Sequence, residues 1–303
     1  MCSTRIGLGR LHILADGMGG HKGGALAAQL TIDGLRRDLD HAPPTASVIP
    51  LLRRAFARAN QDVYQKAHSD DPETQGMGST AVLLLIADRT AYVAHVGDSR
   101  AYLLRKGRLR RLTKDHTRAQ RMVDAAVLTP EQALDHPSAS VLERALGTKP
   151  EVEVDVAHIL LLKADVILLC SDGLSGCVGD GDIQKILTSG LPVSEMPRRL
   201  VDLALRRGSK DNITVQCIQY GRTSRLPRVL RWALIITVAA LVLLAYPVYS
   251  YMGYRGTKID EALRAIHSRY QKLSERLAGW LTRLQLQLPD AQPRTNTTKP
   301  RVL

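Results

Sequence analysis

The feature that most constrains this chain of 303 residues is a run of 21 residues without a charged side chain, from Trp232 to Met252. As a helix, an apolar run of this length crosses about 30 Å of hydrocarbon. Trp232 lies at one end, and Tyr249 and Tyr251 lie near the other, as is typical of interfacial aromatic residues. The run predicts one transmembrane helix over 232–252, with a buried core helix as the alternative.

The apolar run divides the chain into parts of different composition. We expect a folded domain over 1–221, a basic juxtamembrane linker over 222–231, the transmembrane helix, a heptad-patterned helix over 255–288 and a disordered tail over 289–303. The linker carries four arginines. Arginines beside a span favour the cytoplasmic side, so the folded domain is expected in the cytoplasm.

The segment after the apolar run has a second regular pattern. Large apolar residues step by four and three positions in alternation from Ile259 to Leu284. This heptad spacing predicts a coiled coil that could form a homodimer through 259–284. A single amphipathic helix lying on the membrane is the alternative.

Composition indicates the kind of partner. The formal net charge is +13, whereas aromatic residues make up 4% of the chain. A basic chain attracts acidic partners such as anionic lipid or phosphorylated protein. Nucleic acid is not expected, because the aromatic side chains on which single strands stack are nearly absent. The basic stretch from Arg100 to Arg121 is either a solvated face or a surface that attracts phosphorylated substrates or the anionic inner leaflet.

The folded domain combines clustered strands with paired helices, which is an α+β pattern with antiparallel sheets. Helices are expected over 24–39, 48–68, 180–189 and 194–207, and strands over 11–15, 79–86, 90–96, 101–105, 108–113, 152–157, 165–170 and 213–220.

A glycine-rich loop follows the first expected strand, in the sequence ILADGMGGHKGG at 13–24. Its spacing fits neither the dinucleotide fingerprint nor the P-loop. Asp16 stands at the strand end, Asp172 follows a second apolar strand, and Asp211 precedes a third. Such carboxylates could converge at one edge of a pair of sheets, where their oxygens suit Mg²⁺ or Mn²⁺.

Six segments together resemble the metal-dependent protein phosphatases (PPM family, type 2C) in their bacterial form. They are DGMGGHKGG at 16–24, GMGSTAVLLLI at 76–86, AHVGDSRAYLLRKGRLRRLTKDHT at 94–117, HPSASVLERALG at 136–147, VILLCSDGLS at 166–175 and SKDNITVQ at 209–216. The resemblance covers roughly residues 11–220. It implies a sandwich of two antiparallel sheets flanked by helices, with two Mn²⁺ or Mg²⁺ ions at one end.

The resemblance also implies roles for individual residues. Asp16 would bridge both metals, the Gly17 carbonyl would bind one, and Asp172 and Asp211 would hold one. A metal-bound water would attack phosphoserine or phosphothreonine, with no covalent intermediate. Asp98 matches a third-metal ligand, but Gly176 replaces its usual acidic partner, so a third metal is doubtful. His21 and Asn212 are expected to support the metal ligands without binding the metals.

One family feature is not found. Relatives begin with a strand and an RxxNED-like motif whose arginine holds the substrate phosphate. Only fifteen residues precede Asp16, and neither Arg5 nor Arg10 matches that arginine. Either the sequence starts late, or the protein is a relative with impaired catalysis. The missing strand is also expected to leave a neighbouring sheet edge exposed.

These observations predict a serine/threonine phosphatase anchored in the bacterial inner membrane that opposes a protein kinase on phosphoserine and phosphothreonine proteins. The alternative is a phosphatase-like scaffold or regulatory protein. A third hypothesis makes the tail a sensor whose dimerisation regulates the phosphatase.

Overall fold

The computed structural model describes residues 1–221 together with residues 237, 261, 264–265, 267–269 and 271. Residues 1–223 form one compact unit and 224–303 a second. The expected linker, transmembrane helix and tail lie almost wholly outside the described residues. Among the helices that can be described, none has both the length and the apolar character needed to cross a bilayer.

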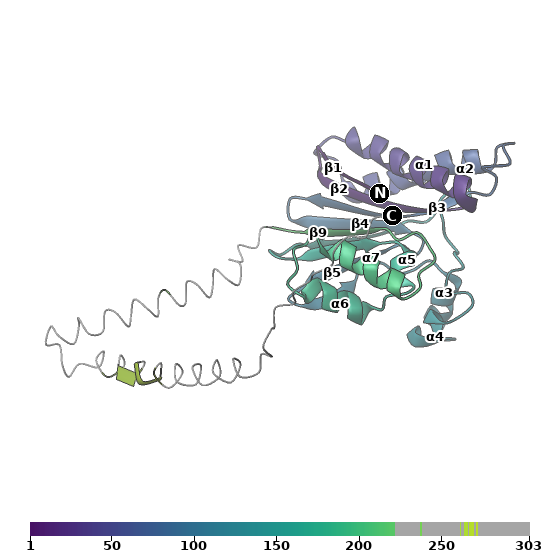
Figure 1. Cartoon of the computed structure of the whole chain (residues 1–303). Helices are drawn as coiled ribbons and strands as arrows, with labels where there is room; N and C mark the ends of the chain where they lie inside the picture. The colour runs from purple at the N-terminus through teal and green to yellow at the C-terminus, as the bar shows by residue number, and fades with distance from the viewer. Residues whose placement is uncertain (222–236, 238–260, 262–263, 266, 270, 272–303) are drawn as a thin grey trace, which may run out of the picture. The chain divides into compact units, whose positions relative to one another are not determined.

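The first unit is a sandwich of two antiparallel sheets, as predicted. One sheet has the strand order β1-β2-β3-β4-β7 and the other the order β6-β5-β8-β9. Figure 1 shows α1 and α2 over one outer face and α5, α6 and α7 over the other.

The elements have the following bounds: β1 Cys2–Ile6, β2 Gly9–Met18, α1 Gly20–Asp40, α2 Val48–Ala67, β3 Gly78–Ala87, β4 Thr90–Val96, β5 Arg100–Arg105, β6 Arg108–Arg111, α3 Arg118–Asp124, α4 Pro130–Leu134, β7 Asp155–Leu160, β8 Val166–Cys170, α5 Asp172–Ser175, α6 Asp180–Thr188, α7 Met196–Arg206 and β9 Val215–Gln219.

Side-chain alternation along the central strands builds three layers of core. In β3, Leu83 and Leu85 pack in the cluster that includes α1 and α2, whereas Val82 and Leu84 pack between the two sheets. A third cluster joins the other sheet to α6 and α7. Because both faces of β3 are covered, the strand reads as a continuous apolar run.

Several predicted elements needed correction. The structure begins with β1, which pairs with β2 and was not predicted. Strand β7 starts at Asp155, three residues later than expected, and α3, α4 and α5 were missed. Within residues 1–221, β9 pairs only with β8, so its outer edge has no strand partner.

The ends of the strands that carry the predicted metal ligands lie at one end of the sandwich in both sheets. Strands β2 and β4 both run toward this end, because each is antiparallel to β3. In the other sheet, Cys170 at the end of β8 pairs with Arg100 at the start of β5 and with Val215 at the start of β9. The segments that carry Asp16, Asp98, Asp172 and Asp211 therefore all lie at this end, which we call the acidic end.

Candidate metal centre

Asp16 and Gly17 lie in the last three residues of β2, where the strand meets helix α1. Asp16 pairs with Thr80 and Gly17 with Ser79, and the Ser79 hydroxyl donates to the Asp16 carbonyl at 3.0 Å. A Cβ atom at Gly17 would lie 1.8 Å from the carbonyl oxygen of Gly24 in α1. Glycine is required at position 17 because the helix backbone passes so close to the strand.

Asp172 opens the short helix α5, directly after the buried strand β8. The Ser171 hydroxyl donates to the Asn212 carbonyl at 3.1 Å and accepts from the Thr214 amide at 3.0 Å. A Cβ atom at Gly173 would lie 2.4 Å from the same Asn212 carbonyl. These contacts hold the segment that carries Asp211 against the segment that carries Asp172.

The acidic side chains from these segments interact. Several effects raise the pKa of Asp16 to about 7. Burial is the largest of them, and it is followed by the charge of Asp172, a hydrogen bond with Asp172, and the charges of Asp211 and Asp98. Burial raises the pKa of Asp98 to about 7, and the charges of Asp172 and Asp115 add to this. The pKa of Asp172 is also raised, by burial and then by Asp211. All four of these aspartates were named from the sequence, Asp98 through the family resemblance, and the charges of the other three all act on Asp16.

Asp16, Asp98, Asp172 and Asp211, which we call the acidic cluster, have side chains that suit divalent cations. Their oxygen donors are the type that Mg²⁺ and Mn²⁺ prefer. Crowded, partly buried carboxylates repel one another, and a doubly charged cation among them would favour their ionised forms. Asp16, Asp172 and Asp211, with the Gly17 carbonyl, could hold such ions.

Three other predicted residues have clear positions. Gly176 ends the helical turn that begins at Asp172, and its amide donates to the Asp172 carbonyl at 2.7 Å. It therefore brings no carboxylate to the position one turn from Asp172. Asn212 lies beside Asp211, and its backbone N–H donates to the Asp211 carboxylate at 2.7 Å. His21 lies in the first turn of α1.

Neither N-terminal arginine reaches the acidic cluster. Arg5 of β1 pairs with Arg10 of β2, at the opposite end of the sheet from Asp16. Arg10 precedes Asp16 by six strand residues, which corresponds to about 20 Å. The structure therefore gives neither arginine a place from which to hold a phosphate at the acidic cluster.

A second cluster contains two histidines and a carboxylate. Ligand atoms of His95, His116 and Asp155 all lie within 4.8 Å of one another. However, the Gly97 amide donates to Nδ1 of His116 at 3.1 Å, so neutral His116 carries its proton on Nε2. Arg144 also lies 3.1 Å from Asp155. A hydrogen-bonded ion pair, not a cation site, fits this arrangement.

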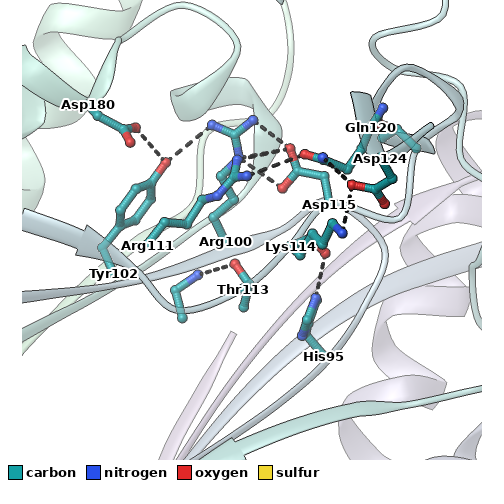
Figure 2. Close-up of polar contacts among 12 residues, drawn as sticks. His95, Arg100, Tyr102, Arg111, Thr113, Lys114, Asp115, Gln120, Asp124 and Asp180 are labelled. Carbon is teal, nitrogen blue, oxygen red and sulfur yellow. Dashed lines mark hydrogen bonds and ion pairs between the residues drawn. The ribbon is translucent and has the colours of Figure 1, made fainter. Parts of the chain in front are cut away.

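An internal ion-pair network beside Asp98 was not predicted. Arg100 contacts Asp115 through Nη2 at 2.6 Å and through Nε at 3.0 Å, and both side chains are largely buried. The Tyr102 hydroxyl accepts from Arg100 at 3.2 Å and donates to Asp180 at 3.0 Å. Figure 2 shows this chain of contacts. For Arg100, the interpretation of the basic stretch as a solvated face is wrong.

Comparisons with known proteins agree with this geometry. A family model described as Protein phosphatase 2C matches residues 10–122. The protein phosphatase PhpP of Streptococcus pneumoniae is 35% identical over 208 residues, which cover 68% of this chain and 84% of that protein. The chain belongs to the protein phosphatase 2C family. It is therefore a member of a family of hydrolases.

Two further matches within the protein phosphatase 2C family concern PstP. The serine/threonine protein phosphatase PstP of Mycobacterium tuberculosis is 42% identical over 207 residues, which cover 68% of this chain and 39% of that protein. This chain thus matches well under half of the length of PstP. A solved structure of the PstP catalytic domain in complex with two manganese ions is 39% identical, with a TM-score of 0.63, and covers 71% of this chain and 89% of that one.

Proposed function

We propose that this protein is a metal-dependent phosphatase that hydrolyses phosphoserine and phosphothreonine in proteins and opposes a protein kinase. The observation that carries the proposal is the acidic cluster, in which segments distant in sequence bring Asp98, Asp172 and Asp211 close enough to Asp16 for their charges to raise its pKa. The two manganese ions of the related PstP structure support two divalent ions as cofactors here.

The roles of this chain's residues follow from their positions. Asp16, Asp172 and Asp211 would hold two Mn²⁺ or Mg²⁺ ions with the Gly17 carbonyl, and Asn212 would orient Asp211. Bound ions of this kind activate water and stabilise charge on the phosphoryl oxygens. Asp98 would stabilise this charge arrangement or hold a weaker third ion, for which Gly176 offers no second carboxylate.

Activity with a small phosphate ester and with a phosphothreonine peptide tests this function. In Mn²⁺, the full chain should hydrolyse both, and Asp16→Asn should reduce kcat/KM by a factor of about 100 or more. Asp124→Asn is the matched control, because Asp124 is exposed and pairs only with Lys114 and Gln120 among the described residues. Calorimetry should show that Asp16→Asn also weakens Mn²⁺ binding.

A phosphatase-like scaffold is the alternative, and the positions of Arg5 and Arg10 favour it. A phosphate held without an arginine loses both positioning and charge stabilisation. Wild-type turnover equal to that of Asp16→Asn, with Mn²⁺ still bound, would support the scaffold and reject the enzyme.

We also propose that residues 232–252 anchor the protein in the bacterial inner membrane, with the folded unit in the cytoplasm. The uncharged run and the four arginines before it support this topology. The full chain should float with membranes and resist extraction at alkaline pH. Recovery of the chain in the alkaline supernatant would reject the anchor.

The heptad pattern over 259–284 supports self-association of the anchored protein. In detergent, the full chain should have the mass of a dimer, and Leu273→Asp should reduce it to a monomer. A coupling of this dimer to phosphatase activity would make the tail a sensor, whereas an unchanged monomeric mass in wild type would exclude both ideas.

A further inference from the structure

Three turns meet at the end of the sandwich opposite the acidic end. The turn between β3 and β4 contacts the loop between β7 and β8, since the Leu161 amide donates to the Arg89 carbonyl at 2.7 Å. Arg105, the last residue of β5, donates to the carbonyl of Leu160 at the end of β7 at 2.7 Å. Residues 88–89 and 160–164 are therefore in contact, and residues 106–108, which directly follow Arg105, lie at the same end of the sandwich.

The last described residues of the folded unit belong to the same surface. The Ala164 amide donates to the Tyr220 carbonyl at 3.0 Å, and the Tyr220 hydroxyl donates to the Asp88 carbonyl at 3.0 Å. A Cβ atom at Gly221 would lie 3.4 Å from Cγ of Lys163. We call residues 88–89, 106–108, 160–164 and 220–221 the exit surface, because the chain leaves the folded unit there.

The exit surface combines unpaired cations with exposed apolar side chains. Its exposed cations are Arg89, Lys106, Arg108 and Lys163, for which the structure shows no ion pair within residues 1–221. Leu160 is 55% exposed and Leu162 is 36% exposed. The exposed carboxylate on this surface is Asp88, whereas the nearby Asp165 is buried and neutralised by Arg105 at 2.7 Å.

The sequence that follows Gly221 indicates what would lie next to the exit surface. Directly after Gly221 come the four linker arginines of 222–231 and then the uncharged run from Trp232 to Met252. At most ten residues separate the exit surface from a segment suited to hydrocarbon. A bilayer that holds this segment would therefore lie within reach of the exit surface.

We propose that the exit surface binds the anionic headgroups of the bilayer in which residues 232–252 are anchored, with Leu160 and Leu162 in the interfacial layer. This inference rests on the membrane anchor proposed above. Each lysine or arginine close to an anionic leaflet contributes about 1 kcal/mol, and apolar side chains add burial in the interface. A phosphopeptide or a nucleic acid would use the cations but leave the exposed leucines unexplained.

Lysine acylation of the full chain in nanodiscs tests the proposal. The discs contain either phosphatidylcholine alone or phosphatidylcholine with about 30% phosphatidylglycerol. Lys106 and Lys163 are the reporters, and Lys22 and Lys149, near the acidic end, are the references. In anionic discs the reactivity of both reporters should fall at least fivefold, and the references should not change. Potassium chloride at about 0.5 M should reverse most of the difference.

Two matched double charge reversals test whether the cations of the exit surface cause the protection of Lys163. Lys106→Glu/Arg108→Glu should restore the reactivity of Lys163 in anionic discs, whereas Arg118→Glu/Lys149→Glu should leave Lys163 protected. Both changes affect exposed side chains, and activity on a small phosphate ester should report intact folding of each variant.

The outcomes separate the two membrane proposals. A chain that does not incorporate into discs would reject the anchor. A chain that incorporates but shows equal Lys106 and Lys163 reactivity in both lipids would overturn the exit-surface proposal and leave the anchor intact. Protection of these lysines by a soluble phosphopeptide, without any lipid dependence, would also overturn it.

Discussion

At the scale of single residues, close backbone contacts and buried polar groups define the folded unit. Gly17 and Gly24 approach each other so closely that a side chain at Gly17 has no room. His12 of β2 is 8% exposed, and its Nδ1 lies 3.0 Å from the Ser3 hydroxyl. Both features predict measurable effects on stability.

Replacing Gly17 with alanine should destabilise the protein. The new Cβ would lie 1.8 Å from the Gly24 carbonyl, so strand β2 and helix α1 would have to separate. We expect a loss of about 2 kcal/mol or more in the free energy of unfolding, measured with denaturant. Gly181→Ala is the control, because open space surrounds Gly181 in α6, and it should stabilise by up to about 1 kcal/mol. Equal stability of the two variants would contradict the close contact at Gly17.

The burial of His12 predicts a specific pH dependence. Burial first, and then the charge of Arg10, lowers the pKa of His12 from 6.5 to about 4. Above pH 6.5, the side chain is neutral in both folded and unfolded protein. As the pH falls from 6.5 to about 4, only the unfolded protein takes up the proton, so the folded state loses stability.

Denaturant unfolding at about pH 7.5 and about pH 5 measures this contribution. Wild type should lose about 1 to 2 kcal/mol more than His12→Gln between these values, because glutamine does not titrate. The comparison isolates His12 from His95 and His116, whose pKa values burial also lowers. Parallel losses in wild type and variant would contradict the assignment to His12.

At the scale of elements, much of the fold could be predicted from the sequence. Short apolar runs indicated the positions of β3, β4 and β5, because strands that are covered on both faces read as such runs. Strand β7 was placed too early because Val152 and Val154 alternate and pack on the core without pairing, whereas pairing with β4 begins at Asp155.

Short elements and long-range pairs could not be predicted in the same way. Strand β1 has a mixed sequence and is defined by its pairing with β2. Helix α4 has five residues, although the capping box of Thr129 and Gln132 was a usable signal. The Arg100–Asp115 pair depends on how the chain after β6 returns to β5, which no local pattern encodes.

The Arg100–Asp115 ion pair predicts that Asp115 contributes much more to the free energy of unfolding than Asp124 does. Asp115→Asn would leave Arg100 largely buried without a full counter-charge, because their side chains are 14% and 10% exposed. We expect a loss of about 3 kcal/mol in the free energy of unfolding. Asp124→Asn removes the exposed pair with Lys114 and should cost less than about 1 kcal/mol. Similar losses in both variants would show that the Arg100 pair is not important for stability.

At the scale of the whole molecule, the described strands and their cores all lie within residues 1–221. A chain that ends at Gly221 should therefore fold and keep the metal-dependent kcat of the full chain on a small ester. Circular dichroism and activity measurements check this expectation. A shortened chain that fails to fold would show that residues after Gly221 stabilise the folded unit.

The length of strand β2 sets a distance between the two ends of this unit. Gly9 lies toward the exit surface and Asp16 at the acidic cluster, seven strand residues apart, which corresponds to about 24 Å. With the exit surface on the bilayer and β2 along the membrane normal, the acidic cluster would stand up to about that height above the headgroups. An extended segment of a neighbouring membrane protein needs about seven residues to rise so far. In that orientation, phosphorylated residues of membrane proteins would reach the acidic cluster only if they lie about this far from the membrane, and residues closer to the membrane would not reach it.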